Sequence, residues 1–247
     1  MNTKLTILTG LFMLFLTGCF SKKSAETPRV HEEITTNTSL DGSMLEVHFT
    51  AGSEHNHPLM AIWIEDMEGN YLQTIYVAKS IAKGVFEHGD ASSGKWMPGA
   101  IRRPAALPVW SHSHGVKAED GLYIPSEKNP LPDAVTGATP KANFTVTSKL
   151  KSDISGPFVV KFEINQPWDF NEYWTNNKYP DNDEYKTSCQ PALVYGITLN
   201  ASDKSQWKAL ELLGHAHYAG ENGKIYEDVS TITTAREITE SVRVILY

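Results

Sequence analysis

The 247-residue sequence predicts an all-β fold in which antiparallel strands form a sandwich of two sheets. Short segments that alternate between apolar and polar residues, or are continuously apolar, recur along the chain with turn-forming residues between them. No long segment carries the 3.6-residue period of an amphipathic helix, and no internal repeat of fixed length is found. Together these observations favour an antiparallel β-sandwich of the immunoglobulin-like type.

The strands are predicted in chain order. Apolar and polar residues alternate in residues 43–50, as in a half-buried strand. Two apolar runs in residues 59–78 flank the loop Asp66–Asn70, which predicts a β-hairpin. Later strands are expected at residues 144–147, 157–164, 192–199, 207–214 and 241–247.

A long insertion, at about residues 79–143, separates the hairpin from the later strands. It is too long for a plain connection in a compact domain, and we expect it to be largely irregular with one short helix. Loops of this size on a rigid scaffold usually carry function. The insertion is therefore the first place to look for a site.

The N-terminus has the features of a secretory signal. Lys4 precedes an apolar run that is too short to cross roughly 30 Å of hydrocarbon as a helix. The run ends in Leu16-Thr17-Gly18-Cys19, which resembles the bacterial lipobox. That resemblance implies that residues 1–18 are removed and that Cys19 is lipidated, which anchors the protein on the extracytoplasmic side of the cell envelope. The alternative is an ordinary cleaved signal with a chance cysteine. Phe20 rather than Asp after the cysteine favours the outer membrane, where the cell has one.

Residues 19–42 are polar and without apolar periodicity, which predicts a flexible tether before a single domain at residues 43–247. The net charge of −7 argues against binding to nucleic acid or to an anionic membrane surface. Once Cys19 is acylated, Cys189 has no cysteine partner. We expect Cys189 to be a small buried residue rather than a reactive thiol.

The insertion contains the segment Asp133-Ala134-Val135-Thr136-Gly137-Ala138-Thr139. It resembles the D-x-x-S/T-G-A-T motif of proteins that receive FMN through a phosphoester bond from an FAD-dependent flavin transferase outside the cytoplasm. The resemblance implies that Thr139 is the acceptor and Asp133 the upstream acid. It also implies that Thr136, Gly137 and Ala138 fit the transferase. Pro140 departs from the better-known pattern, although it keeps Thr139 out of the helical region.

A plain turn is the alternative interpretation of this segment. In that case Gly137 would form a type I or type II turn, and Asp133 and Thr136 would cap backbone amides.

Histidines provide a second candidate site. Six of the nine lie in three H-x-H pairs: His55 and His57, His112 and His114, and His215 and His217. In an extended segment residues i and i+2 point the same way, so each pair can present two imidazoles to one ion. Two pairs, or one pair with His88, Cys189 or Asp90, would complete a zinc or copper site. Axial ligation of a haem is also open, although no C-x-x-C-H is present. Solvent-facing or hydrogen-bonded histidines are the alternative.

The pair His112 and His114 ranks first because it shares the insertion with the Thr139 segment. An aromatic-rich stretch at residues 165–179 could stack on a planar ligand or close the end of the sandwich. No G-x-S-x-G, Walker, H-E-x-x-H or Rossmann pattern is found, so a hydrolase is poorly supported.

Several segments together resemble a family of bacterial extracytoplasmic proteins associated with PepSY-type membrane reductases and flavin transferases. They are IWIEDMEGNYLQTIYVA, LPVW, DAVTGAT, FEINQPWDFNEY, QPALVYGITL and GHAHYAGENGKIYEDVSTITTAREI. The resemblance spans Ser43 to Tyr247 and implies a sandwich fold and an electron-transfer role. The resulting expectation is a lipid-anchored electron carrier with FMN on Thr139, rather than an enzyme with its own substrate. The alternatives are a metal- or haem-binding protein and a non-catalytic assembly partner of a membrane redox complex.

Overall fold

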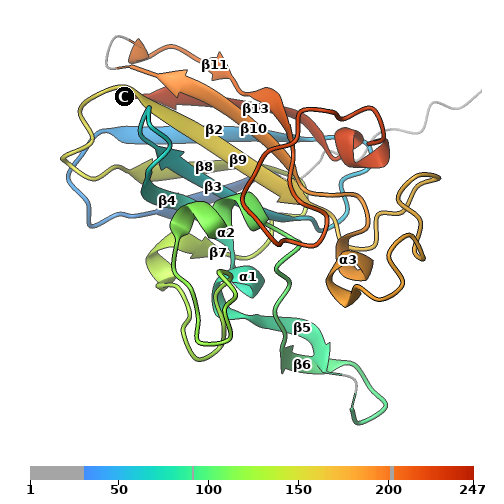
Figure 1. Ribbon diagram of the computed structural model, residues 1–247. Coiled ribbons are helices and arrows are strands. Elements are labelled where there is room, and N and C mark those ends of the chain that lie inside the picture. Colours follow the sequence, from blue (N-terminus) through green and yellow to red (C-terminus); the bar gives the residue numbers. More distant parts are fainter. Residues whose placement is uncertain (1–30, 91, 201–202) are drawn as a thin grey trace, which may run out of the picture.

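The computed structural model describes residues 31–90, 92–200 and 203–247, and two large sheets form its body (Figure 1). The five-stranded sheet contains, in spatial order, β1 (His31–Thr36), β8 (Asn143–Lys149), β2 (Met44–Ala51), β13 (Thr239–Leu246) and β11 (Lys208–Ala209). The six-stranded sheet contains β12 (Glu211–His215), β10 (Leu193–Leu199), β9 (Phe158–Asn165), β3 (Leu59–Glu65), β4 (Tyr71–Ala78) and β7 (Thr136–Gly137).

The predicted all-β sandwich is confirmed, and the finer immunoglobulin-like assignment stays a prediction. Neighbouring strands are antiparallel except in two pairs, β1 with β8 and β4 with β7. The hairpin of β3 and β4 and the later strands lie where the sequence placed them, with one exception. Residues 207–214 do not form one strand, because the segment divides at Leu210 and contributes β11 to one sheet and β12 to the other.

The folded domain begins earlier than predicted. Residues 31–36, expected to belong to the tether, form β1 and pair in parallel with β8. Only Ile34 of this strand packs on the central core, so HEEITT lacks the apolar pattern by which strands are recognised. Cys19 and the signal peptide lie outside the described residues.

The central core fills the space between the two sheets. Alternate residues of β2 face alternate residues of β9 across it, and Phe49 lies 5.7 Å from Phe162 between ring centroids. Phe49 also stacks on Phe144 of β8 at 4.7 Å. Each such ring stabilises the fold by about 1.5–3 kcal/mol through burial.

The insertion covers the outer face of the six-stranded sheet, where a second apolar cluster forms around Trp63, Ile81 and Trp110. Its elements are α1 (Lys79–Lys83), β5 (Val85–Asp90), β6 (Met97–Ala100), α2 (Pro108–His114) and the 3-10 helix η1 (Asp133–Val135). The insertion is therefore more regular than predicted, with two short helices and a hairpin, β5–β6, that projects from the sandwich (Figure 1).

Two short elements complete the fold, α3 (Asp183–Ser188) and the 3-10 helix η3 (Thr234–Glu237). In the part of the chain that the structure describes, no helix is both long and apolar enough to cross a membrane.

Candidate functional site

The Thr139 segment lies along the edge of the six-stranded sheet. After η1, residues Thr136 and Gly137 pair in parallel with Val77 and Ala78 of β4. Gly137 is extended rather than the centre of a turn. A Cβ atom at this position would lie 2.8 Å from Cε2 of Tyr76. The glycine is therefore required because the backbone lies directly on the Tyr76 ring.

Thr139 lies between two anchored residues. The Tyr76 hydroxyl donates to the carbonyl of Ala138 at 2.9 Å, and Pro140 on the other side is buried. Thr139 itself is half-buried. Within the described residues the Thr139 hydroxyl makes no hydrogen bond, so no such contact in that part of the chain fixes its position.

The turn interpretation required the side chains of Asp133 and Thr136 to cap backbone amides. Within the described residues neither side chain does so. Asp133 is exposed and forms an ion pair with Lys83 at 2.9 Å. The hydrogen bond from Lys83, followed by the charges of Lys83 and Lys79, lowers the pKa of Asp133. The Thr136 hydroxyl donates a long, weak bond of 3.5 Å to the carbonyl of Asp133.

His112 and His114 do not point the same way, because they lie on a helix rather than on an extended segment. Pro108 begins α2 and Gly115 ends it in the left-handed conformation, with a φ of 76°. Residues two apart on a helix project about 200° from each other. The His112 ring accordingly contacts Tyr123, whereas His114 stacks on Trp110.

The other two pairs lie in loops or at the end of a strand. His57 is exposed with a φ of 55°, and its Nδ1 bonds to the side chain of Asn56. His55 is half-buried and its ring contacts Phe49. His215 ends β12, and both it and His217 contact the ring of Tyr226.

Backbone contacts determine which imidazole nitrogens are available to a metal. The Nδ1 atoms of His112 and His215 lie 2.8 Å from carbonyl oxygens, so each Nδ1 carries the proton and leaves the Nε2 lone pair free. His217 is the reverse, because its Nδ1 accepts from the backbone N–H of Ala219. A neutral His217 therefore carries its proton on Nε2, so this nitrogen has no lone pair to offer a metal ion.

No group of three histidine, cysteine or acidic side chains in the described residues is placed to hold a metal ion. The additional ligands considered from the sequence have other environments. His88 is exposed on β5, and Asp90 accepts from the backbone N–H of Ser92. Cys189 is fully buried, as predicted, and burial raises the pKa of its thiol to about 12.

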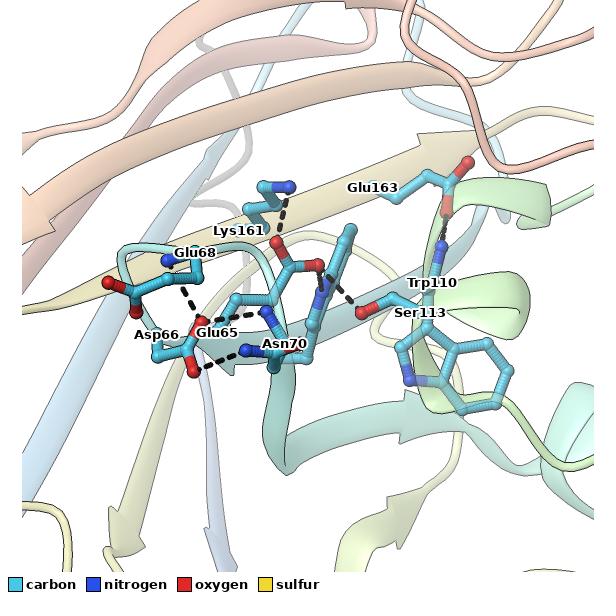
Figure 2. Close-up of polar contacts among 9 residues, drawn as sticks. Glu65, Asp66, Glu68, Asn70, Trp110, Ser113, Lys161 and Glu163 are labelled. Atoms are coloured by element: carbon cyan, nitrogen blue, oxygen red, sulfur yellow. Dashed lines mark hydrogen bonds and ion pairs between the residues drawn. The ribbon is translucent and has the colours of Figure 1, made fainter.

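A buried polar network beneath α2 escaped the sequence analysis (Figure 2). Glu65 accepts hydrogen bonds from Trp63 Nε1 at 2.7 Å and Ser113 Oγ at 2.6 Å, and it pairs with Lys161 at 2.6 Å. Glu163 accepts from the backbone N–H groups of Val109 and Trp110. In the sequence, Lys161, Glu163 and Asn165 alternate with apolar neighbours as on a solvent face, so no local signal marks this network as buried.

The aromatic stretch at residues 165–179 has a mixed role. Trp174 packs into the central core, while Trp168, Phe170 and Tyr173 are exposed. Comparisons of the chain with protein-family models, with curated proteins and with solved structures find no match.

Proposed function

We propose that this protein is a lipid-anchored electron carrier of the bacterial cell envelope that holds FMN covalently on Thr139. The observation that carries the proposal is the environment of Thr139. Its neighbours Ala138 and Pro140 are held in place, yet Thr139 itself is only half-buried and its hydroxyl makes no hydrogen bond in the described chain. An acceptor hydroxyl must be free to reach a phosphorus atom, and the small residues Gly137 and Ala138 on an extended backbone favour access to it.

Attachment would proceed by phosphoryl transfer from FAD, catalysed by an extracytoplasmic flavin transferase. The Thr139 Oγ attacks the phosphorus that bears the riboflavin, and the bond from that phosphorus to the AMP oxygen breaks. The hydroxyl proton passes to a base of the transferase, AMP leaves, and the product is a phosphodiester at Thr139. Lys83 and Lys79, which act on Asp133, place positive charge near this segment and suit an anionic phosphodiester.

Bound FMN supplies uptake and release of one or two electrons with their protons, delivered by a PepSY-type membrane reductase. The protein would hold the attached flavin in a fixed position. The Thr139 segment is fixed to β4 by two backbone pairs and by the Tyr76 hydroxyl, and this would hold an attached group at one edge of the sheet. The lipid on Cys19 would keep the carrier at a membrane surface.

The test compares protein produced with and without a flavin transferase on a denaturing gel, where covalent flavin fluoresces. The wild type should fluoresce only with the transferase, and Thr139→Val should remove the signal. Thr198→Val is the matched control, because it deletes a half-buried threonine hydroxyl on β10, outside this segment, and should keep the signal. Fluorescence retained by Thr139→Val would contradict the proposal.

A transition-metal role is the second candidate, favoured by the carbonyl contacts that leave Nε2 of His112 and His215 free. The loop after His215 reaches α2, since a Cβ at Gly223 would lie 2.6 Å from Cβ of His112. Elemental analysis of untagged protein, with His215→Ala compared with His57→Ala, tests it. Loss of metal only in His215→Ala supports the role, and equal metal content in both variants contradicts it.

A further inference from the structure

Three aromatic rings surround the ammonium group of Lys178 in the loop between β9 and α3 (Figure 1). The Nζ atom lies 3.3 Å from the ring centroid of Tyr173, 5.2 Å from that of Trp174 and 5.9 Å from that of Tyr179. The planes of Tyr173 and Trp174 stand at 75° to each other, so these two rings form a corner. We call the three rings the aromatic cage. Rings placed in this way attract a cation through their electron-rich faces.

Hydrogen bonds and stacking hold the walls of the aromatic cage. The side chain of Asn171 accepts from the backbone N–H of Tyr173 at 2.9 Å and from that of Trp174 at 2.6 Å. Tyr179 stacks on Tyr218 with 4.1 Å between ring centroids and 8° between planes. The cage is therefore preorganised, which lowers the entropic cost of binding a ligand there.

The aromatic cage is open to solvent on one side. Tyr173 is 51% exposed, whereas Trp174 is 5% exposed and has the Lys178 ammonium over its ring. Lys178 is itself half-buried. A lysine ammonium is carried on a flexible four-carbon stem, so it can leave the cage by rotation of its own side chain. Such a rotation would uncover the inner wall without a change in the backbone.

Lys178 is an imperfect occupant of the aromatic cage. Within the described residues its ammonium makes no hydrogen bond and no ion pair, so the three rings are its close partners there. A primary ammonium carries three N–H donors, and the ring faces offer them no lone pair. A quaternary ammonium has no N–H to satisfy, and it is attracted to the rings in the same way. The chemistry of the cage thus suits a quaternary ammonium better than a lysine.

The charge of Lys178 determines what else such a ligand must carry. A displaced Lys178 remains tethered beside the aromatic cage, where its ammonium would repel a ligand that is only cationic. A ligand that also carries a carboxylate or phosphate group would instead form an ion pair with the displaced ammonium. The lysine therefore favours a zwitterion over a simple cation.

We propose that the aromatic cage binds the quaternary ammonium group of a zwitterionic ligand, and that the anionic group of this ligand pairs with the displaced ammonium of Lys178. Betaines and phosphocholine headgroups share this chemistry. The lysine occupies the cage until the ligand displaces it. The site is separate from Thr139, so it does not depend on attachment of a flavin.

Calorimetric titration of the full-length protein with glycine betaine, phosphocholine and choline tests the proposal. The wild type should bind at least one of the two zwitterions several-fold more tightly than choline, which lacks the anionic group. Tyr173→Leu removes the exposed wall of the cage and should weaken this binding several-fold. Tyr247→Leu is the matched control, because it changes an exposed tyrosine at the C-terminal residue and should leave the binding unchanged.

Lys178→Gln separates the two roles of the lysine. It removes the competing cation, so choline should bind several-fold more tightly than it binds to the wild type. It also removes the ion-pair partner, so the preference for a zwitterion over choline should disappear. Lys186→Gln, which changes a lysine of α3 that pairs with Asp183, should alter neither property.

Tighter binding of phosphocholine would identify the ligand as a lipid headgroup, and tighter binding of glycine betaine would identify it as a free solute. Absence of binding by the wild type would overturn the proposal, whatever Lys178→Gln binds. Unchanged binding by Tyr173→Leu would also overturn it. Equal binding of choline and the zwitterions by the wild type would refute the role of Lys178 and, with it, the proposed ligand class.

Discussion

The carboxylate of Glu163 accepts a 2.7 Å hydrogen bond from the backbone N–H of Trp110. A second bond, of 3.1 Å, comes from the N–H of Val109. A central strand of the sheet therefore holds the first turn of α2, the helix that carries His112 and His114 (Figure 2). Glu163 is fully buried, and burial raises its pKa to about 8 although both bonds and the charge of Lys161 oppose the rise.

Glu163→Gln should change how stability depends on pH. The folded pKa is about 8 against an ordinary value of 4.5, so the folded protein retains a proton that the unfolded chain releases between these values. The contribution of Glu163 to the wild-type free energy of unfolding should therefore be greatest at the acid end of this window. It should fall as pH rises, by up to about 4 kcal/mol between about pH 5 and about pH 8. The variant lacks this titration. Urea unfolding across this pH range measures the free energy of unfolding of the wild type and of Glu163→Gln. An equal dependence on pH in the two proteins would contradict the raised pKa of Glu163.

Glu65→Ala should be strongly destabilising. It would leave the mostly buried ammonium of Lys161 without its ion-pair partner, and the side-chain donors of Trp63 and Ser113 without an acceptor. Breaking a buried pair in this way costs about 3–5 kcal/mol. Denaturant unfolding gives the value.

The matched control for Glu65→Ala is Asp183→Ala. It breaks an ion pair with Lys186 in which the aspartate side chain is 95% exposed. Such surface pairs contribute about 0–1 kcal/mol. Similar losses of stability in the two variants would show that the Glu65 network is not the buried, mutually dependent unit described above.

Gly137→Ala should reduce both stability and flavin loading. The added Cβ would meet the Tyr76 ring at 2.8 Å and push the Thr139 segment off the sheet edge, at a cost of about 1–3 kcal/mol. Gly156→Ala is the control, since no atom lies within 4 Å of its Cβ position. Thermal unfolding and gel fluorescence after transferase treatment report the two effects. Normal loading of Gly137→Ala would argue against the importance of this close approach.

Cys189 should be unreactive in the native protein. It is fully buried and burial raises the pKa of its thiol to about 12, so almost no thiolate is present at neutral pH. A thiol reagent should label the denatured protein rapidly and the native protein very slowly. Rapid labelling of the native state would show that the segment around α3 opens readily.

The sequence by itself determined the strands that build the central core. Alternation in residues 43–50 and the hairpin loop Asp66–Asn70 predicted β2, β3 and β4, because local burial on one or both faces leaves a direct pattern in the residues. The continuous apolar run of β3 was correctly assigned to a strand. Both faces of β3 are buried, one by the central core and the other by the insertion, which forms a layer over the outer face of the sheet.

Only the tertiary structure decided the candidate site. Lys161 and Glu163 alternate with apolar residues as if they faced water, yet α2, which lies in the insertion and is distant in sequence, covers Glu163 and buries it. The sequence predicted that His112 and His114 form one ligand pair, but both lie on α2, where residues two apart point in different directions. A cavity of about 250 Å³ beside Val135 likewise forms only where residues 37–40, 71–74 and 131–135 meet His114 and Lys151. These features arise from contacts between residues far apart in the chain, and such contacts leave no periodic signal in the local sequence.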